Sequence, residues 1–294
     1  MKKIAVGLIA VFGLTLLQTM PAKATGETIV IVDNLFDSTR PELKNNIVHE
    51  VCITVSNFCS ARLMSAEGIG AANAPADLVY KNTQSRHGTD LALVAAKVNP
   101  NARLILMRTS GISTRNQVSD INDMHLYVRH FEWIAANKNK YNIVSVVFSK
   151  DYGRNDNGSC VVKRPDQAFV QVIQRLTNMG IAVMAGTGNN GWTGRTSFPS
   201  CIKETVSVGG TMDWQPGLYA SSNLSSDTDF FAVAGWNIAT SRVIGTSFSN
   251  VALAAYWTKN YQGSFQKTYD YLKSIGKNDS HSRIASYTFI DVTK

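Results

Sequence analysis

Short apolar runs rich in valine and isoleucine recur along the chain, and polar segments or helical patterns separate them. The runs are Ile29–Val32, Leu104–Met107, Ile143–Phe148, Ile181–Ala185 and Thr205–Val208. Runs of this kind, apolar at nearly every position, are typical of strands that are buried on both faces. Such strands in alternation with helices predict an α/β domain with a mostly parallel sheet.

Three segments between the apolar runs have hydrophobic residues at helical spacing. The first has Leu91, Val94, Ala95 and Val98; the second has Ile121, Met124, Val128, Phe131 and Ala135; the third has Phe169, Val172, Ile173 and Leu176, between Pro165 and Gly180. The polar stretches Asp151–Lys163, Gly186–Ser200 and Thr211–Asp229 are interpreted as surface connections. We find no internal repeat or linker, so one domain is expected.

The first 24 residues have the pattern of a secretory signal. A basic pair, Lys2–Lys3, precedes the apolar run Ile4–Met20, and Ala22–Ala24 supplies the small residues that a signal peptidase recognises. We therefore expect cleavage before Thr25, a domain over residues 25–294, and a secreted or periplasmic protein. A membrane anchor is the alternative, but the run is short for a span and a cleavage site follows it.

The net charge gives no reason to expect a nucleic-acid partner. The formal charge of +8 falls to +5 when the three lysines of the signal are removed, and no run of basic residues stands out, so we expect no nucleic-acid partner.

The four cysteines are Cys52, Cys59, Cys160 and Cys201. An even number on an exported chain suggests two disulfides, with three possible pairings. No Cys/His cluster has zinc spacing, so no metal site is expected.

Four polar motifs lie where strands end or helices begin. Asp33 follows the first apolar run, His87 opens a helix in the sequence His-Gly-Thr, and Ser247 opens another in Gly-Thr-Ser. Gly188-Asn189-Asn190-Gly191 follows the run Ile181–Ala185. Each motif alone is an ordinary turn or helix cap. Together they matter more, because ligands of parallel sheets bind beyond the carboxyl ends of the strands.

The order Asp, His, Ser with these surrounding residues resembles the subtilase family, the subtilisin-like serine peptidases. The resemblance extends over nearly all of residues 25–294. It includes Phe198-Pro199, where the family has a cis-proline, the segment Val206–Gly210, and a closing strand at Phe289–Val292. It implies a three-layer α/β/α sandwich with a mostly parallel central sheet.

The resemblance also implies a function and its residues. The chain would be a secreted serine endopeptidase that forms an acyl-enzyme on Ser247, with His87 as general base and Asp33 as its orienting carboxylate. Asn189 would donate a hydrogen bond to the oxyanion, and Asn190 is the alternative donor. The substrate would be a protein or peptide, and we expect a monomer without cofactor or metal.

The resemblance also implies which residues line the S1 pocket and how the cysteines pair. The S1 pocket would be lined by Phe148, Ser149, Gly186, Thr187, Gly188 and Ser197. The family often has glycine at Ser149 and Ser197, so we expect a narrow pocket that prefers small or medium side chains. The pairing Cys52–Cys59 is local, and Cys160–Cys201 would join two loops that flank the same pocket in the family fold.

The chain departs from the family near each motif. Asn34-Leu35 follows the aspartate where the family has Ser or Thr and then Gly; Asp90–Leu93 and Phe248–Val251 replace the usual residues after the histidine and the serine. These departures motivate the alternative of a weak or inactive module that binds a peptide or partner protein. Only Thr25–Val32 would precede Asp33 in the mature chain, so we expect a distant member that folds without a prosegment or the family's N-terminal calcium site.

Overall fold

A sheet of ten strands forms the centre of the molecule in a computed structural model that describes residues 26–54, 58–59, 63–113, 117–119, 123–148, 160, 162, 166–212, 217–239 and 241–293. Its strands are β1 (Thr28–Asp33), β2 (Ile47–Ile53), β3 (Ser65–Glu67), β4 (Arg103–Arg108), β7 (Ile143–Phe148), β8 (Ala182–Gly186), β9 (Val206–Thr211), β10 (Phe230–Val233), β13 (Lys277–His281) and β14 (Ile284–Phe289). The spatial order is β13-β14-β10-β9-β8-β7-β1-β4-β2-β3, with antiparallel pairs only at the two edges.

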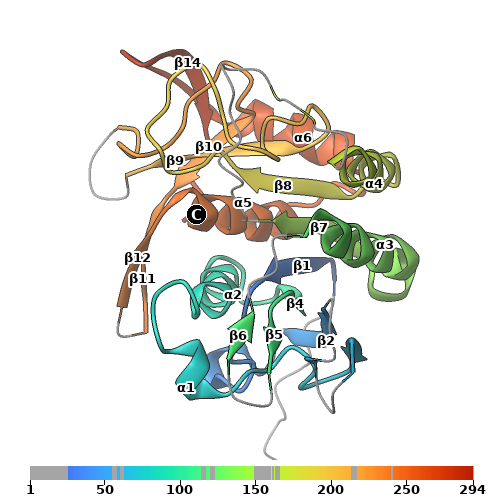
Figure 1. The fold of residues 1–294 in the computed structure, drawn as a ribbon. Coiled ribbons are helices and arrows are strands. Elements are labelled where there is room, and N and C mark those ends of the chain that lie inside the picture. The colour runs from blue at the N-terminus through green and yellow to red at the C-terminus, as the bar shows by residue number, and fades with distance from the viewer. Residues whose placement is uncertain are drawn as a thin grey trace, which may run out of the picture.

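Helices cover both faces of this sheet (Figure 1). They are α2 (His87–Val98), α5 (Thr246–Lys259) and α6 (Phe265–Ile275) on one face, and α3 (Met124–Tyr141) and α4 (Gln167–Asn178) on the other. Strand β1 shows why both faces need cover: Ile29 and Ile31 pack toward α2 and α5, whereas Val30 and Val32 pack toward α3 and α4. The expected three-layer α/β/α sandwich is confirmed.

Helix α5 lies in the middle of the molecule and is surrounded by other elements (Figure 1). Every side chain from Thr246 to Thr258 is buried. Small residues such as Ala252, Ala254 and Ala255 let α2 and the strands approach it closely. Helix α5 thus has no face that is turned to solvent. The elements around it therefore hold its amino-terminal turn in place.

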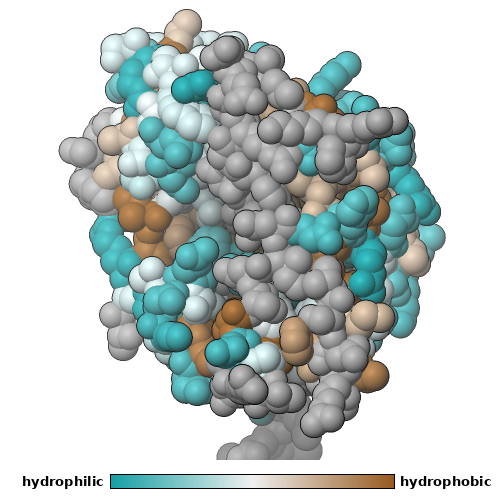
Figure 2. Space-filling model, in the orientation of Figure 1, coloured by the Kyte–Doolittle hydropathy of each residue, from teal (hydrophilic) through white to brown (hydrophobic). Residues whose placement is uncertain are grey.

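Smaller elements complete the chain. They are η1 (Pro41–Leu43), α1 (Ala76–Val79), the ribbon of β5 (Gly111–Ile112) with β6 (Val118–Ser119), and the ribbon of β11 (Gly235–Ile238) with β12 (Ser241–Ile244). In the described part of the chain, none of the helices combines the length and apolar character needed to cross a membrane. On the face seen in Figure 2, hydrophobic residues form small areas between hydrophilic ones.

The five strands expected from the apolar runs are all present, within about two residues at most ends. The expected closing strand at Phe289–Val292 is wrong: β14 ends at Phe289, and only the N–H of Ile290 continues to pair, with the Phe231 carbonyl. The C-terminal hairpin escaped prediction because β13 is exposed at every position and so has no apolar pattern. The predicted signal lies outside the described residues.

Two disulfides join Cys52 to Cys59 and Cys160 to Cys201, the pairs that were expected. The first links the end of β2 to the chain just beyond it. The second attaches Cys160 to the turn that follows the cis peptide bond Phe198–Pro199. Disulfides are typical of proteins from oxidising compartments.

Candidate active site

Asp33 and His87 meet at the carboxyl end of the central strand. Asp33 is the last residue of β1, and His87 is the first residue of α2. The Nδ1 atom of His87 lies 2.8 Å from Oδ2 of Asp33, and the other carboxylate oxygen accepts the N–H of Asn34 at 2.7 Å. A carboxylate bound to Nδ1 fixes the ring's orientation and leaves Nε2 as the nitrogen that can accept a proton.

Close backbone packing holds this pair in place. A Cβ atom on Gly88 would lie 2.6 Å from the carbonyl oxygen of Leu35 and 3.0 Å from Cβ of Asp33, so only glycine fits between α2 and the end of β1. The next residue, Thr89, accepts the N–H of Asp37 on its hydroxyl at 2.9 Å. The residues after the histidine therefore fasten the helix to the segment that carries the aspartate.

The charges around His87 favour its protonated form. Burial by itself lowers the pKa of His87, but the charge of Asp33 and its hydrogen bond, together with the charge of Asp90, outweigh burial and raise the pKa above its ordinary value. Asp90 is one of the departures from the family pattern. It follows His87 within the first turn of α2 and pairs with Arg86 at 2.9 Å, which satisfies its carboxylate in a nearly buried position.

Ser247 lies on the first turn of α5. It is nearly buried, with 9% of its surface exposed. The ring of Phe248, the residue after it, lies 5.4 Å from the imidazole ring of His87, centre to centre. Gly245 precedes the helix with a φ of 151°, a conformation that glycine adopts without strain. The residue that follows the serine thus lies next to the histidine, on the first turn of α5.

Asn189 contacts the same helix start from the end of β8. Its Oδ1 atom accepts the N–H of Thr246 at 2.9 Å, and its amide packs against Gly245. The Nδ2 group then has no hydrogen-bond partner within the described part of the chain. Asn190, the alternative donor, turns its side chain toward Asn223 instead, at 3.4 Å. Of these two asparagines, Asn189 is the one whose side chain is hydrogen-bonded to the helix start that carries Ser247 in the described residues.

A buried asparagine that sequence patterns did not reveal organises the loop of Asn189. Asn223 accepts the N–H groups of Asn190 and Trp192, both at 3.0 Å, and donates to the Thr187 carbonyl at 2.9 Å and the Ser197 hydroxyl at 3.1 Å. It is fully buried. Its only sequence signal is a place in a polar stretch, which does not distinguish it from a surface loop residue.

Arg283, which lies between the two strands of the C-terminal hairpin, stabilises the Asn189 loop through hydrogen bonds. Its guanidinium donates to the carbonyls of Ala220 and Gly191, both at 2.9 Å, and to that of Ser222 at 3.2 Å. One side chain thus ties the Asn189 loop to the segment that leads into Asn223. An arginine suits this role because its planar group presents several donors at once.

Some of the residues expected to line an S1 pocket have buried side chains, and others border the site. The ring of Phe148 is 1% exposed and packs edge-on against Tyr127 and Phe131 in the core, so its side chain does not line a pocket. Thr187 and Ser197 are also buried, because their hydroxyls bond within the Asn223 network. These three side chains therefore point into the protein, and Ser197, one of the two serines expected to narrow the pocket, does not narrow it with its side chain.

The two glycines of this set approach the helix that carries Ser247. A Cβ on Gly186 would lie 3.1 Å from backbone atoms of Thr246, and the N–H of Gly188 donates to the Thr246 hydroxyl at 3.2 Å. Both glycines border the site. Ser149, the remaining predicted residue, lies outside the described residues.

Solved structures share this fold, although sequence comparison finds nothing. No family model matches the sequence, and no curated protein matches it significantly. A protease from Pseudoalteromonas arctica is 16% identical with a TM-score of 0.69, over 92% of this chain and 89% of its own. A lanthipeptide protease is 14% identical with a TM-score of 0.63, over 91% and 88%. A cold-adapted subtilisin-like serine proteinase is 15% identical with a TM-score of 0.59, over 92% and 90%. With its parallel sheet and its layers of helices, the chain has the fold of the subtilisin-like proteases.

Proposed function

We propose that this chain is a secreted serine endopeptidase with Ser247 as its nucleophile. The observation that carries the proposal is the 2.8 Å contact between Asp33 and His87, with the ring of Phe248, the residue after Ser247, 5.4 Å from the imidazole ring. The fold neighbours, which are described as proteases, support the same activity. The N-terminal signal pattern and the two disulfides support export.

The arrangement accounts for both steps of peptide hydrolysis. Nε2 of His87 takes the proton from the Ser247 hydroxyl as the oxygen attacks the substrate carbonyl. The carbonyl electron pair moves to the oxygen, which accepts hydrogen bonds from Nδ2 of Asn189 and the N–H of Ser247. The imidazolium then protonates the leaving amine, and water releases the acyl group by the same sequence in reverse. Protein or peptide is the substrate.

Covalent labelling tests the proposal most directly. A fluorophosphonate probe reacts with serines that a neighbouring base activates, so it should label Ser247 and no other residue of the secreted protein. Ser247→Ala and His87→Ala should each abolish labelling and proteolysis, and the double variant should be no worse, because the residues act as a unit. Ser249→Ala, two positions along the same buried helix, is the matched control and should label normally.

Absence of labelling would decide between the two candidate functions. Folded wild-type protein that resists the probe between pH 6 and pH 9 contradicts the peptidase proposal. It would favour the alternative that the departures around the motifs suggest, an inactive module that binds a peptide or partner. Circular dichroism and the two disulfides provide the check that the protein tested is folded.

A further inference from the structure

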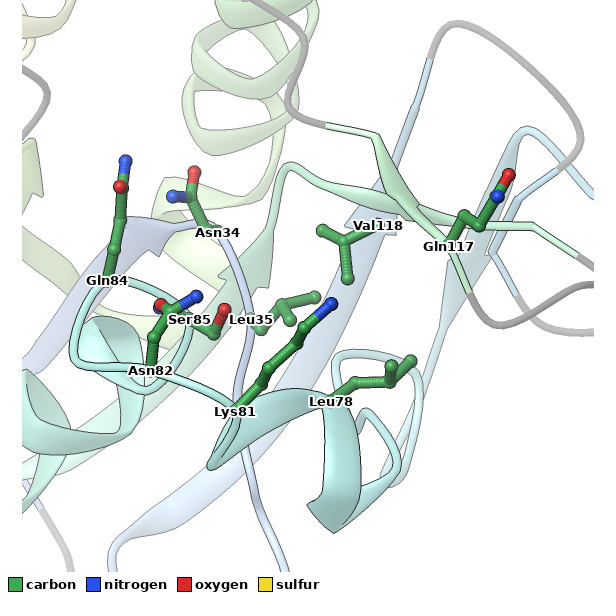
Figure 3. A pocket seen from close by; sticks show the side chains of 9 residues that line it. All are labelled: Asn34, Leu35, Leu78, Lys81, Asn82, Gln84, Ser85, Gln117 and Val118. Carbon is green, nitrogen blue, oxygen red and sulfur yellow. The ribbon is translucent and has the colours of Figure 1, made fainter.

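Figure 3 shows a cavity whose lining includes residues close in sequence to Asp33 and His87. Its volume is about 410 Å³, within the range of ligand-binding pockets. It is lined by Asn34, Leu35, Leu78, Lys81, Asn82, Gln84, Ser85, Gln117 and Val118. Asn34 follows Asp33 in the chain and Ser85 comes two residues before His87, so the cavity adjoins the residues proposed to act on substrate.

The floor and the rim of this cavity differ in chemistry. Leu35 and Leu78 are buried and form an apolar cluster under it, against which Val118 packs. The rim carries side-chain amides, those of Asn34, Asn82, Gln84 and Gln117, together with the Ser85 hydroxyl. An apolar floor with polar groups above it suits a guest with an aliphatic stem and a polar end.

Lys81 supplies the one charge among the described residues that line the cavity. Figure 3 shows its side chain extending across the cavity, with the ammonium group directed toward Val118. Within the described part of the chain, no hydrogen bond or ion pair engages this ammonium group. Three acids of the adjoining segments have partners: Asp33 pairs with His87, Asp90 with Arg86, and Asp37 with the Tyr80 hydroxyl. Asp77, four residues before Lys81, is exposed to solvent.

We propose that this cavity binds a glutamate or aspartate side chain of the substrate polypeptide, near the bond that is cut, and that Lys81 selects the carboxylate. The inference rests on the proposed peptidase function and adds the substrate class. The aliphatic part of the acidic side chain lies over Leu35 and Leu78, and its carboxylate accepts hydrogen bonds from Lys81 and the rim amides. Repulsion by neighbouring acids is limited, because Asp33 and Asp90 pair with His87 and Arg86 and solvent screens the charge of the exposed Asp77.

A peptide series with one variable position tests this inference. Otherwise identical substrates carry Glu, Gln or Lys in turn at each position around the cleaved bond, and kcat/KM is measured. At one position Glu should exceed Gln by about fivefold, the upper size of a solvent-accessible ion pair, and Lys should be poorest. The preference should weaken as salt is added.

Variants of the lysine decide whether it is the cause. Lys81→Met, which keeps the stem without the charge, should make Glu and Gln equal, and Lys81→Glu should favour the Lys substrate. Lys267→Met, at an exposed lysine on α6 that does not line the cavity, is the matched control and should keep the preference for Glu.

Failure of this inference is distinguishable from failure of the proposed function. Wild-type enzyme that is labelled at Ser247 but cuts Glu and Gln substrates equally at every position overturns the inference alone. Peptide binding to the Ser247→Ala variant, measured by fluorescence anisotropy, gives a second readout that needs no catalysis. Tighter binding of the Glu peptide that Lys81→Met abolishes supports the inference, and equal binding of both peptides overturns it.

Discussion

The two sides of the candidate active site are built by different means. On the acid–base side, Gly88 brings α2 so close to β1 that no additional atom fits between them. On the oxyanion side, Asn189 is positioned by a loop whose shape depends on many side-chain hydrogen bonds, centred on Asn223 and Arg283. One side is therefore fixed by steric contact between backbones, and the other by a network of polar groups.

This difference predicts how each side fails. Where two backbones touch without free space, even one added methyl group must push the neighbouring atoms apart, because protein interiors are close-packed. A change at such a contact is therefore expected to disturb the site strongly. A network of hydrogen bonds loses its members one at a time, each worth only about 1 kcal/mol. Changes to the acid–base side should thus be severe, and changes remote from Asn189 on the oxyanion side should be graded.

Asp33→Asn is expected to lower catalysis more than any other single change outside the nucleophile and the base. The amide no longer stabilises the imidazolium or fixes its tautomer, and kcat should fall by about 10⁴-fold. Because Asp33 raises the pKa of His87, activity of the wild type should rise with pH through a midpoint above that of an ordinary histidine. In the variant this midpoint should move to lower pH. A pH profile with an unchanged midpoint would show that Asp33 does not control the base.

Asn189→Ala tests the oxyanion side at its centre. It removes the free amide but leaves the nucleophile and base, so kcat should fall by about 10²–10³-fold with little change in KM. Labelling at Ser247 should persist, more slowly. Asn190→Ala is the matched neighbour and should cost much less, since its side chain faces Asn223. Equal losses in the two variants would contradict the assignment of Asn189 as donor.

Gly88→Ala tests whether steric contact sets the acid–base side. The new Cβ would lie 2.6 Å from the Leu35 carbonyl oxygen, so α2 or the end of β1 must shift. A shift of about 1 Å in His87 is enough to lower kcat by about 10²-fold. The thermal midpoint should fall as well. Full activity in this variant would show that the helix start yields easily, and the contrast between the two sides would disappear.

Arg283→Ala should have the smallest effect, about tenfold or less on kcat, because it removes outer members of the network only. Its action through Asn189 is measurable in a double-mutant cycle: the Arg283→Ala effect should largely vanish in an Asn189→Ala background. Lys277→Ala, on the same exposed hairpin, is the control. Additive losses would mean that Arg283 affects activity by a route other than the oxyanion donor.

Motif order located Asp33 and His87, which meet in the structure, and Asn189, which contacts the helix start that carries Ser247. Each motif alone is an ordinary strand end or helix start, so the signal lies in their combination and order. Phe148 was misplaced because a strand residue next to a site has two faces to choose from, and only packing against α3 and α4 shows that its ring is in the core.

Apolar periodicity by itself determined the α/β class and the positions of the central strands and main helices, because burial on a sheet or helix imposes a regular spacing on the sequence. Only the tertiary structure decided that Asn223 and Arg283 organise the Asn189 loop, and that Asn34, Lys81 and Val118 border one cavity. These residues are far apart in the chain, and Asn223 and Arg283 act through polar side chains. Such contacts depend on how the elements are arranged in space, and they leave no periodic trace in the sequence.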